Sequence, residues 1–130
     1  MKAANIPGGT PIATILFVYG TLKRGLRNHF RIGDQSFLGE AVTEPRYRVI
    51  DLGPHPGLVV DSTNGLAVRG ELWAVNDRCL AELDAFEEVP GPFTRDPVAI
   101  AGLEDVYAYL LNIPVPANAP TGDRWPLEVE

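Results

Sequence analysis

The pattern of hydrophobic and polar positions predicts one clear helix among many short strands. Over residues 77–87 the apolar positions follow the i, i+1, i+4, i+7 spacing of a helix with one apolar face. These positions are Cys79, Leu80, Leu83 and Phe86. Pro90 and Gly91 follow directly and are residues that end a helix.

Short apolar runs bounded by turn residues predict strands on both sides of this helix. Residues 36–50 fit either a pair of strands or one long bent strand, broken at Pro45. Residues 51–57 predict a rigid loop because they contain two prolines and two glycines. The Asn64-Gly65 pair predicts a hairpin turn. The other predicted strands are 12–18, 58–61, 66–75, 93–100 and 106–113, and residues 28–34 fit one or two helical turns.

The short connections between these strands favour antiparallel pairing. The sequence therefore predicts an α+β fold, a compact and mostly antiparallel curled sheet or barrel with flanking short helices. We expect the domain to cover residues 12–113. A flexible Pro/Gly-rich segment over 1–11 precedes it, and a Pro-rich tail over 114–130 follows it. No apolar run approaches membrane-spanning length, so we expect no signal peptide, transmembrane segment or membrane partner.

Composition narrows the class of protein further. The chain has 130 residues, of which 45% are hydrophobic, as is usual for one globular domain. A net charge of −6 with only 11 basic residues argues against a nucleic-acid partner. Cys79 is the only cysteine, which excludes a disulfide framework and favours a reducing, cytoplasmic location. A monomer is favoured, although nothing in the sequence fixes the oligomeric state.

Glu87 is the most informative candidate for chemistry. It follows Leu83 by four residues and so shares the apolar helix face, whereas Glu82 and Asp84 point away. A carboxylate in apolar surroundings loses solvation, which raises its pKa and suits it to move protons near neutral pH. The alternative, favoured on spacing alone, is a helix-end glutamate that turns into water.

A second candidate is the turn formed by Tyr19, Gly20, Thr21 and Leu22, which closes the first predicted strand. Gly20 allows the backbone to approach a ligand closely. Successive free amides after a strand can hold an anion or an oxyanion. An ordinary turn between a strand and a helix is the alternative.

Four motifs in order resemble the gamma-glutamylcyclotransferase-like superfamily. They are residues 18–25 (VYGTLKRG) followed by Asn28-His29, Gly53-x-x-Pro56-Gly57, residues 70–75 (GELWAV), and residues 83–87 (LDAFE) followed by Phe93-Thr94-Arg95. The resemblance extends from about residue 15 to residue 112. Within the superfamily, these motifs look most like those of the gamma-glutamylamine cyclotransferases.

The resemblance implies an enzyme that cyclises a gamma-glutamyl group. The α-amine attacks the γ-amide carbonyl, 5-oxoproline forms, and the amine partner leaves; one glutamate acts as base and acid. By motif that residue is Glu87, and the substrate-binding residues are Tyr19, Gly20, Thr21, Leu22 and Tyr109. The implied partner is a small gamma-glutamyl molecule, and no metal or cofactor is expected.

Departures from the family pattern concern the amine half of the substrate. Glu88 stands where many relatives have glycine, and Phe93 stands where tyrosine is usual. His55 lies in the Pro/Gly loop and can influence which substrate is chosen. Tyr107 shares a strand face with Tyr109 by alternation and has no assigned role.

Other reactive side chains have ordinary interpretations that we favour. Cys79 as a nucleophile with His29 or His55 is less favoured than a buried structural thiol. The two histidines lack the carboxylate-rich surroundings of a zinc site. We expect Arg95 to form an ion pair and Trp73 to lie in the core.

Three functional hypotheses follow. The first is a cyclotransferase that releases 5-oxoproline and a free amine from an L-gamma-glutamyl amine. The second is a non-catalytic small-molecule-binding or stress-response module on the same fold, for which a carboxylate at Glu87 would serve no purpose. The third is a pathway-specific enzyme that removes a gamma-glutamyl protecting group from a natural product.

Overall fold

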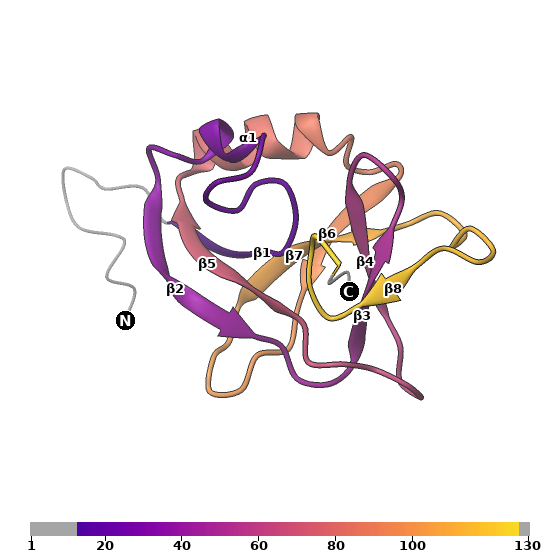
Figure 1. Ribbon diagram of the computed structural model, residues 1–130. Helices are drawn as coiled ribbons and strands as arrows, with labels where there is room; N and C mark the ends of the chain where they lie inside the picture. The colour runs from indigo at the N-terminus through magenta and orange to yellow at the C-terminus, as the bar shows by residue number, and fades with distance from the viewer. Residues whose placement is uncertain (1–12, 128–130) are drawn as a thin grey trace, which may run out of the picture.

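The computed structural model describes residues 13–127, so the predicted N-terminal segment over 1–11 lies outside the described residues. One α-helix and one short 3₁₀ helix accompany eight strands (Figure 1). In chain order the elements are β1 (Thr14–Val18), η2 (His29–Arg31), β2 (Ser36–Val42), β3 (Tyr47–Asp51), β4 (Pro56–Val60), β5 (Arg69–Val75), α1 (Asp77–Phe86), β6 (Phe93–Pro97), β7 (Val106–Leu111) and β8 (Thr121–Gly122).

The eight strands form one sheet in the order β2-β5-β1-β7-β4-β3-β8, and β6 pairs with β7 outside this path. Five strand pairs are antiparallel. The pairs β1–β7 and β4–β7 are parallel. The sheet curls beneath α1 (Figure 1). The predicted α+β fold with a mostly antiparallel curled sheet is confirmed.

Strand β7 has two different partners along one of its edges. Strand β1 pairs with its first two residues, Val106 and Tyr107, and β4 pairs with it only at Leu110. Strand β6 follows the opposite edge from Tyr107 to Leu111. The sheet therefore divides along the first edge, where β1 ends and β4 begins.

The structure decides between the two alternatives for residues 36–50 and corrects the hairpin expected at Asn64-Gly65. Residues 36–50 form two strands, but β2 pairs with β5 whereas β3 pairs with β4 and β8. The Asn64-Gly65 turn does not make a hairpin of β4 and β5, because β5 instead pairs with β1 and β2. A Cβ at Gly65 would lie 2.6 Å from the Arg46 Cα, so this glycine allows the turn to pack on the chain before β3.

The predicted rigid loop over 51–57 is also shorter than expected. Asp51 and Pro56 are Cα partners at the end of the β3–β4 hairpin, so only four residues lie between the strands. The Asp51 carboxylate accepts a hydrogen bond of 2.7 Å from the amide of Gly53. Gly53 has φ +100, a left-handed conformation that favours glycine.

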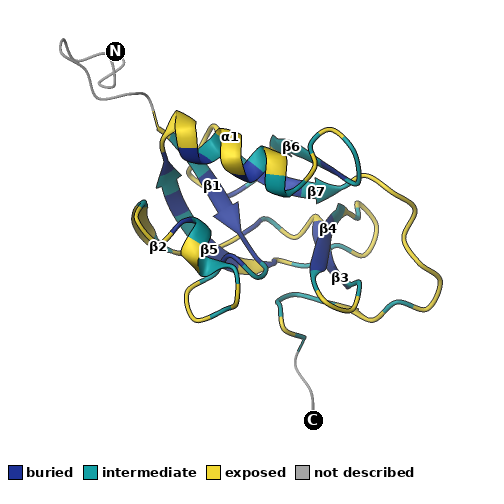
Figure 2. Cartoon of the chain, turned by 90° about the horizontal axis from the view of Figure 1, so that it is seen from above, coloured by how far each residue is buried: buried dark blue, intermediate teal, exposed yellow. Residues whose placement is uncertain are grey.

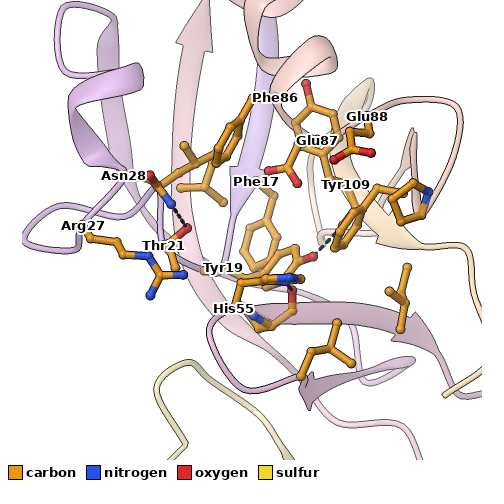
Figure 3. Close-up of a pocket in the computed structure, with 18 of the residues that line it drawn as sticks. Phe17, Tyr19, Thr21, Arg27, Asn28, His55, Phe86, Glu87, Glu88 and Tyr109 are labelled. Carbon is orange, nitrogen blue, oxygen red and sulfur yellow. Dashed lines mark hydrogen bonds between the residues drawn. The ribbon is translucent and has the colours of Figure 1, made fainter. Parts of the chain in front are cut away.

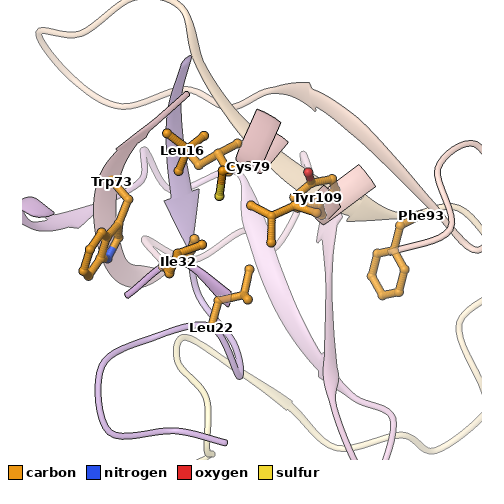
Figure 4. Packing of buried hydrophobic residues seen from close by; sticks show 10 residues of the cluster. Leu16, Leu22, Ile32, Trp73, Cys79, Phe93 and Tyr109 are labelled. Carbon is orange, nitrogen blue, oxygen red and sulfur yellow. The ribbon is translucent and has the colours of Figure 1, made fainter. Parts of the chain in front are cut away.

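Strand β1 separates two hydrophobic clusters because its side chains alternate between the two faces of the sheet. Leu16 and Val18 face a cluster beneath α1, together with Trp73, Cys79 and Leu83 (Figure 4). The intervening residues, Phe17 and Tyr19, belong to the second cluster, with Val49, Leu58 and Val68. The outward face of α1 is exposed (Figure 2). No helix among residues 13–127 is long and apolar enough to cross a membrane.

The segment after residue 113 takes part in the sheet. Strand β8 pairs with β3 through Gly122 and Thr121. Trp125 and Leu127 then pack against the second cluster. The Lys23 ammonium donates a hydrogen bond of 2.5 Å to the Trp125 carbonyl and so ties the segment to the loop after β1.

Candidate active site

A pocket of about 540 Å³ opens where the sheet divides between β1 and β4 (Figure 3). Four parts of the chain meet there: the turn after β1, the β3–β4 hairpin, the end of α1, and the adjacent ends of β6 and β7. The volume lies within the roughly 300–1,000 Å³ range of small-molecule sites. The predicted residues Tyr19, Gly20, Thr21, Leu22, Glu87 and Tyr109 all line it.

Glu87 enters the pocket because it caps the C-terminus of α1. Asn76 begins that helix by accepting a hydrogen bond from the Cys79 amide, and the Glu87 amide donates to the Leu83 carbonyl at its end. The Glu87 carboxylate points into the pocket (Figure 3). Burial raises its pKa to about 7, against the opposing charge of Arg31. A carboxyl group with this pKa can both accept and donate a proton near neutral pH.

The turn after β1 lies very close to the start of β4. A Cβ on Gly20 would lie 2.7 Å from Cγ of Pro56, so a larger residue would push the two segments apart. Thr21 accepts two hydrogen bonds from Asn28, one at its carbonyl and one at its hydroxyl. Within residues 13–127, the amides of Gly20, Thr21 and Leu22 donate no hydrogen bond. The turn therefore lines the pocket with backbone donors that an anion can use.

The Tyr19 side chain bridges strands β7 and β4. Its hydroxyl donates a bond of 2.6 Å to the Tyr109 carbonyl and accepts one of 3.1 Å from the Leu58 amide. The phenol therefore links the backbones of these two strands next to their one pair of Cα partners, Leu58 and Leu110. Burial, with a smaller contribution from the Glu87 carboxylate, holds the pKa of Tyr19 well above its usual range.

Tyr109 lines the pocket with its ring, and its hydroxyl donates a hydrogen bond of 2.7 Å to Asp84. Arg95 binds the same carboxylate through two contacts of 2.9 Å. This confirms the ion pair expected for Arg95 but corrects the expectation that Asp84 points away. Hydrogen bonding from Arg95 holds the pKa of Asp84 below its usual range. The network ties the last turn of α1, which carries Glu87, to β6 and β7.

Sequence reasoning missed one residue that influences Glu87. Arg31 lies on η2, with its guanidinium 3.7 Å from the centroid of the Phe86 ring. Its Nε is buried and has no hydrogen-bond partner among the described residues. The spacing of Arg31 marks no helix face or motif, so only the packing of η2 against α1 brings it near Glu87.

Cys79 is a buried free thiol, as expected, and the two histidines lie in different surroundings. Burial raises the pKa of the Cys79 thiol to about 11, and its Sγ lies 3.6 Å from the Arg31 carbonyl. His29 packs edge-on against Trp73, which is in the core as expected. Of the two histidines, only His55 lines the pocket, with its ring centroid 6.0 Å from that of Phe93. Residues 13–127 contain no group of three or more His, Cys, Asp or Glu arranged to hold a metal ion.

Proteins of similar sequence carry names that refer to gamma-glutamyl cyclotransferase activity. The chain is 38% identical over 96 residues to a Vibrio cholerae protein provisionally named a gamma-glutamylcyclotransferase, covering 73% of this chain and 81% of that protein. It is 37% identical over 98 residues to human gamma-glutamylaminecyclotransferase, covering 70% of this chain and 64% of the human protein.

Solved structures and a family model agree with these relatives. The crystal structure of an AIG2-like protein from mouse superposes with a TM-score of 0.71 at 26% identity, covering 88% of each chain. The solution structure of the Escherichia coli protein ytfP gives 0.67 at 26% identity, covering 87% of this chain and 96% of that one. The model of a family described as gamma-glutamyl cyclotransferase, AIG2-like, matches residues 16–127. The chain therefore belongs to the gamma-glutamyl cyclotransferase, AIG2-like family.

Proposed function

We propose that this protein is a cyclotransferase that converts an L-gamma-glutamyl amine to 5-oxoproline and the free amine. One observation carries the proposal: a carboxyl group with a pKa of about 7 shares a pocket with a strand-end turn whose amides are free to bind an anion. The family and the names of the relatives support the same reaction class.

The reaction needs one proton carrier and a fixed substrate conformation. The neutral α-nitrogen attacks the γ-carbonyl carbon, and a new C–N bond closes the five-membered ring. Glu87 accepts the proton released by the α-nitrogen and returns it to the departing nitrogen as the original C–N bond breaks. Atoms and charge balance without another reactant. Because attack is intramolecular, holding the glutamyl arm in a bent conformation supplies much of the acceleration.

The turn over residues 19–22 is suited to holding the glutamyl half. Its amides can bind the α-carboxylate or the oxyanion that forms on the γ-carbonyl oxygen. The close approach of Gly20 to Pro56 keeps this backbone in one place. The ring of Tyr109 forms part of the same pocket.

Release of 5-oxoproline from a set of gamma-glutamyl amines tests the proposal. We expect equal amounts of 5-oxoproline and amine from the wild-type protein. The Glu87→Gln variant should lose roughly two to four orders of magnitude in rate, because an amide cannot exchange the proton. Glu82→Gln is the matched control, since Glu82 lies on the exposed side of the same helix and forms an ion pair with Arg78. A folded Glu87→Gln protein with near-wild-type turnover would contradict the assignment.

A further inference from the structure

The pocket has an apolar part, beside His55, that comes from the β3–β4 hairpin, the start of β6 and the end of β7. It consists of Leu52, Pro92, Phe93, Leu111 and Ile113, which we call the outer wall. Asn112 fixes it, since its amide donates a bond of 2.8 Å to the Pro92 carbonyl and its side chain donates one of 3.0 Å to the Gly91 carbonyl. A Cβ on Gly57 would lie 3.1 Å from Leu111, so this leucine packs directly on β4.

The outer wall lies where the leaving amine must go in the proposed reaction. Glu87 returns its proton to the departing nitrogen, so that nitrogen must lie beside the Glu87 carboxyl. The turn over residues 19–22 occupies one side of this point with the glutamyl half. The chain after Glu87 leads directly to Pro92 and Phe93, and the end of β7 lies beside them. The group attached to the departing nitrogen therefore extends along the outer wall.

Ile113 is the residue of the outer wall that is most exposed to solvent. Its side chain lines the pocket, yet 46% of the residue is exposed to solvent. Val115, two residues later, is exposed to the same degree, 47%, but does not line the pocket. Large apolar side chains at the rim of a pocket are typical of ligand contact.

The charged residues of the pocket lie outside the outer wall. Arg27 also lines the pocket and donates a hydrogen bond to the Pro54 carbonyl in the β3–β4 hairpin. Glu88 is exposed at the rim beside Glu87. An amine that carries a carboxylate would meet the carboxyl groups of Glu87 and Glu88 and would find no arginine or lysine in the outer wall. A cationic amine would lose solvation against apolar side chains.

We propose that the leaving amine is apolar, an alkyl or aryl amine whose hydrocarbon part packs on the outer wall. This inference rests on the proposed cyclotransferase function and adds the chemical class of the leaving group. Burial of added methylene groups should lower the energy of the bound substrate and of the transition state together, and so raise kcat/KM.

A series of gamma-glutamyl amides that differ only in the amine tests the proposal. We would measure 5-oxoproline release from the methylamide, the isopentylamide, and two amides of similar length that end in a carboxylate or an ammonium group. The isopentylamide should exceed the methylamide by about tenfold or more in kcat/KM. Both charged amides should fall well below the isopentylamide.

Two variants at residues of similar solvent exposure test whether the outer wall causes the preference for the isopentylamide. Ile113→Ser should reduce the ratio of kcat/KM for the isopentylamide over the methylamide several-fold, because it removes apolar contact area. Val115→Ser should leave this ratio unchanged. An unchanged ratio in the Ile113→Ser protein would overturn the role of the outer wall.

The same series separates the failure of this inference from the failure of the proposed function. If no amide releases 5-oxoproline, the cyclotransferase function is wrong. If the amides turn over at similar rates, or the ammonium or carboxylate amide is preferred, the function stands and the apolar leaving group is wrong.

Discussion

The position of Glu87 at the end of α1 determines the surroundings of its carboxyl group. Its backbone completes the last turn of the helix, while its side chain is directed into the pocket (Figure 3). Burial raises the carboxyl pKa to about 7, and the Arg31 charge limits that increase. The two opposing influences set the pH at which this group can exchange a proton.

The first prediction concerns the pH dependence of turnover. Glu87 must be ionised to accept a proton, so kcat/KM should rise with pH through about 7 and level off above it. Arg31→Met removes the charge that lowers the Glu87 pKa, so the rise should move to higher pH. Initial rates between pH 5 and 9 measure both effects.

Arg78→Met is the control for this shift. Arg78 lies on the exposed side of α1 and pairs with Glu82, so removing its charge should leave the pH profile unchanged. A profile that is flat from pH 5 to 9, or one that Arg31→Met does not move, would show that Glu87 does not control the rate.

The second prediction is that Glu87→Gln stabilises the fold at alkaline pH. The folded pKa of about 7 lies above the ordinary value of 4.5, so folding favours the protonated form. The contribution of Glu87 to stability is therefore fully present below pH 4.5 and is lost as pH rises from there through 7, by at most about 3 kcal/mol. A neutral glutamine avoids this loss.

Urea unfolding at pH 5 and pH 8 tests the effect. The gain in unfolding free energy from Glu87→Gln should be larger at pH 8 than at pH 5. Glu82→Gln, with an exposed side chain, should show no such difference. Equal effects of Glu87→Gln at the two pH values would mean that the carboxyl is not desolvated in the folded protein.

At the scale of elements, α1 carries two ion pairs with different roles. The Arg95–Asp84 pair is bidentate, three-quarters shielded from solvent, and crosses from the helix to β6. The Arg78–Glu82 pair joins residues one turn apart on the exposed side of the helix. Burial and geometry favour the first pair as a structural contact.

The third prediction compares these pairs by double-mutant cycles. Asp84→Asn with Arg95→Met should give a coupling free energy of unfolding of about 1–2 kcal/mol, since the pair is bidentate and partly shielded. Arg78→Met with Glu82→Gln should give about 0.5 kcal/mol or less. Similar coupling in both pairs would refute a special role for the contact between α1 and β6.

The elements that the sequence alone predicted are those in which apolar residues recur at a regular spacing. Cys79 and Leu83 recur at helical spacing, and α1 forms within one residue of the expected range. Strand pairing was less predictable because a turn sequence fixes only its own backbone. The Asn64-Gly65 turn forms, yet β5 pairs with strands distant in sequence. Strand β8 has two residues, too few to show any alternation.

The presence of the candidate residues in one pocket was predictable because they belong to sequence motifs. Glu87 and Tyr19 to Leu22 lie in continuous motifs whose order along the chain resembles one family. The outer wall was not predictable, because its residues come from separate segments and are ordinary apolar side chains. Arg31 influences Glu87 only through tertiary packing.

At the scale of the whole molecule, the fourth prediction concerns the segment after residue 113. A chain that ends at residue 119 would lack β8, Trp125 and Leu127, which cover the second hydrophobic cluster. The loss of this buried apolar area should lower Tm by about 5–10 °C. Val115→Ser, which changes one exposed side chain of the same segment, should leave Tm nearly unchanged. An equal Tm for the shortened and full chains would contradict a structural role for the segment.

The division of the sheet at β7 has a consequence for how this fold can diversify. The pocket results from strand order, since β1 and β4 share one edge of β7 without meeting. The pocket therefore does not require a cavity inside the packed hydrophobic core. The Tyr19 hydroxyl links β7 to β4 at the pocket without using any side chain of the outer wall. In the proposed reaction, directed evolution restricted to Leu52 and Ile113 should therefore change the choice of amine while Glu87 and the turn over residues 19–22 stay the same.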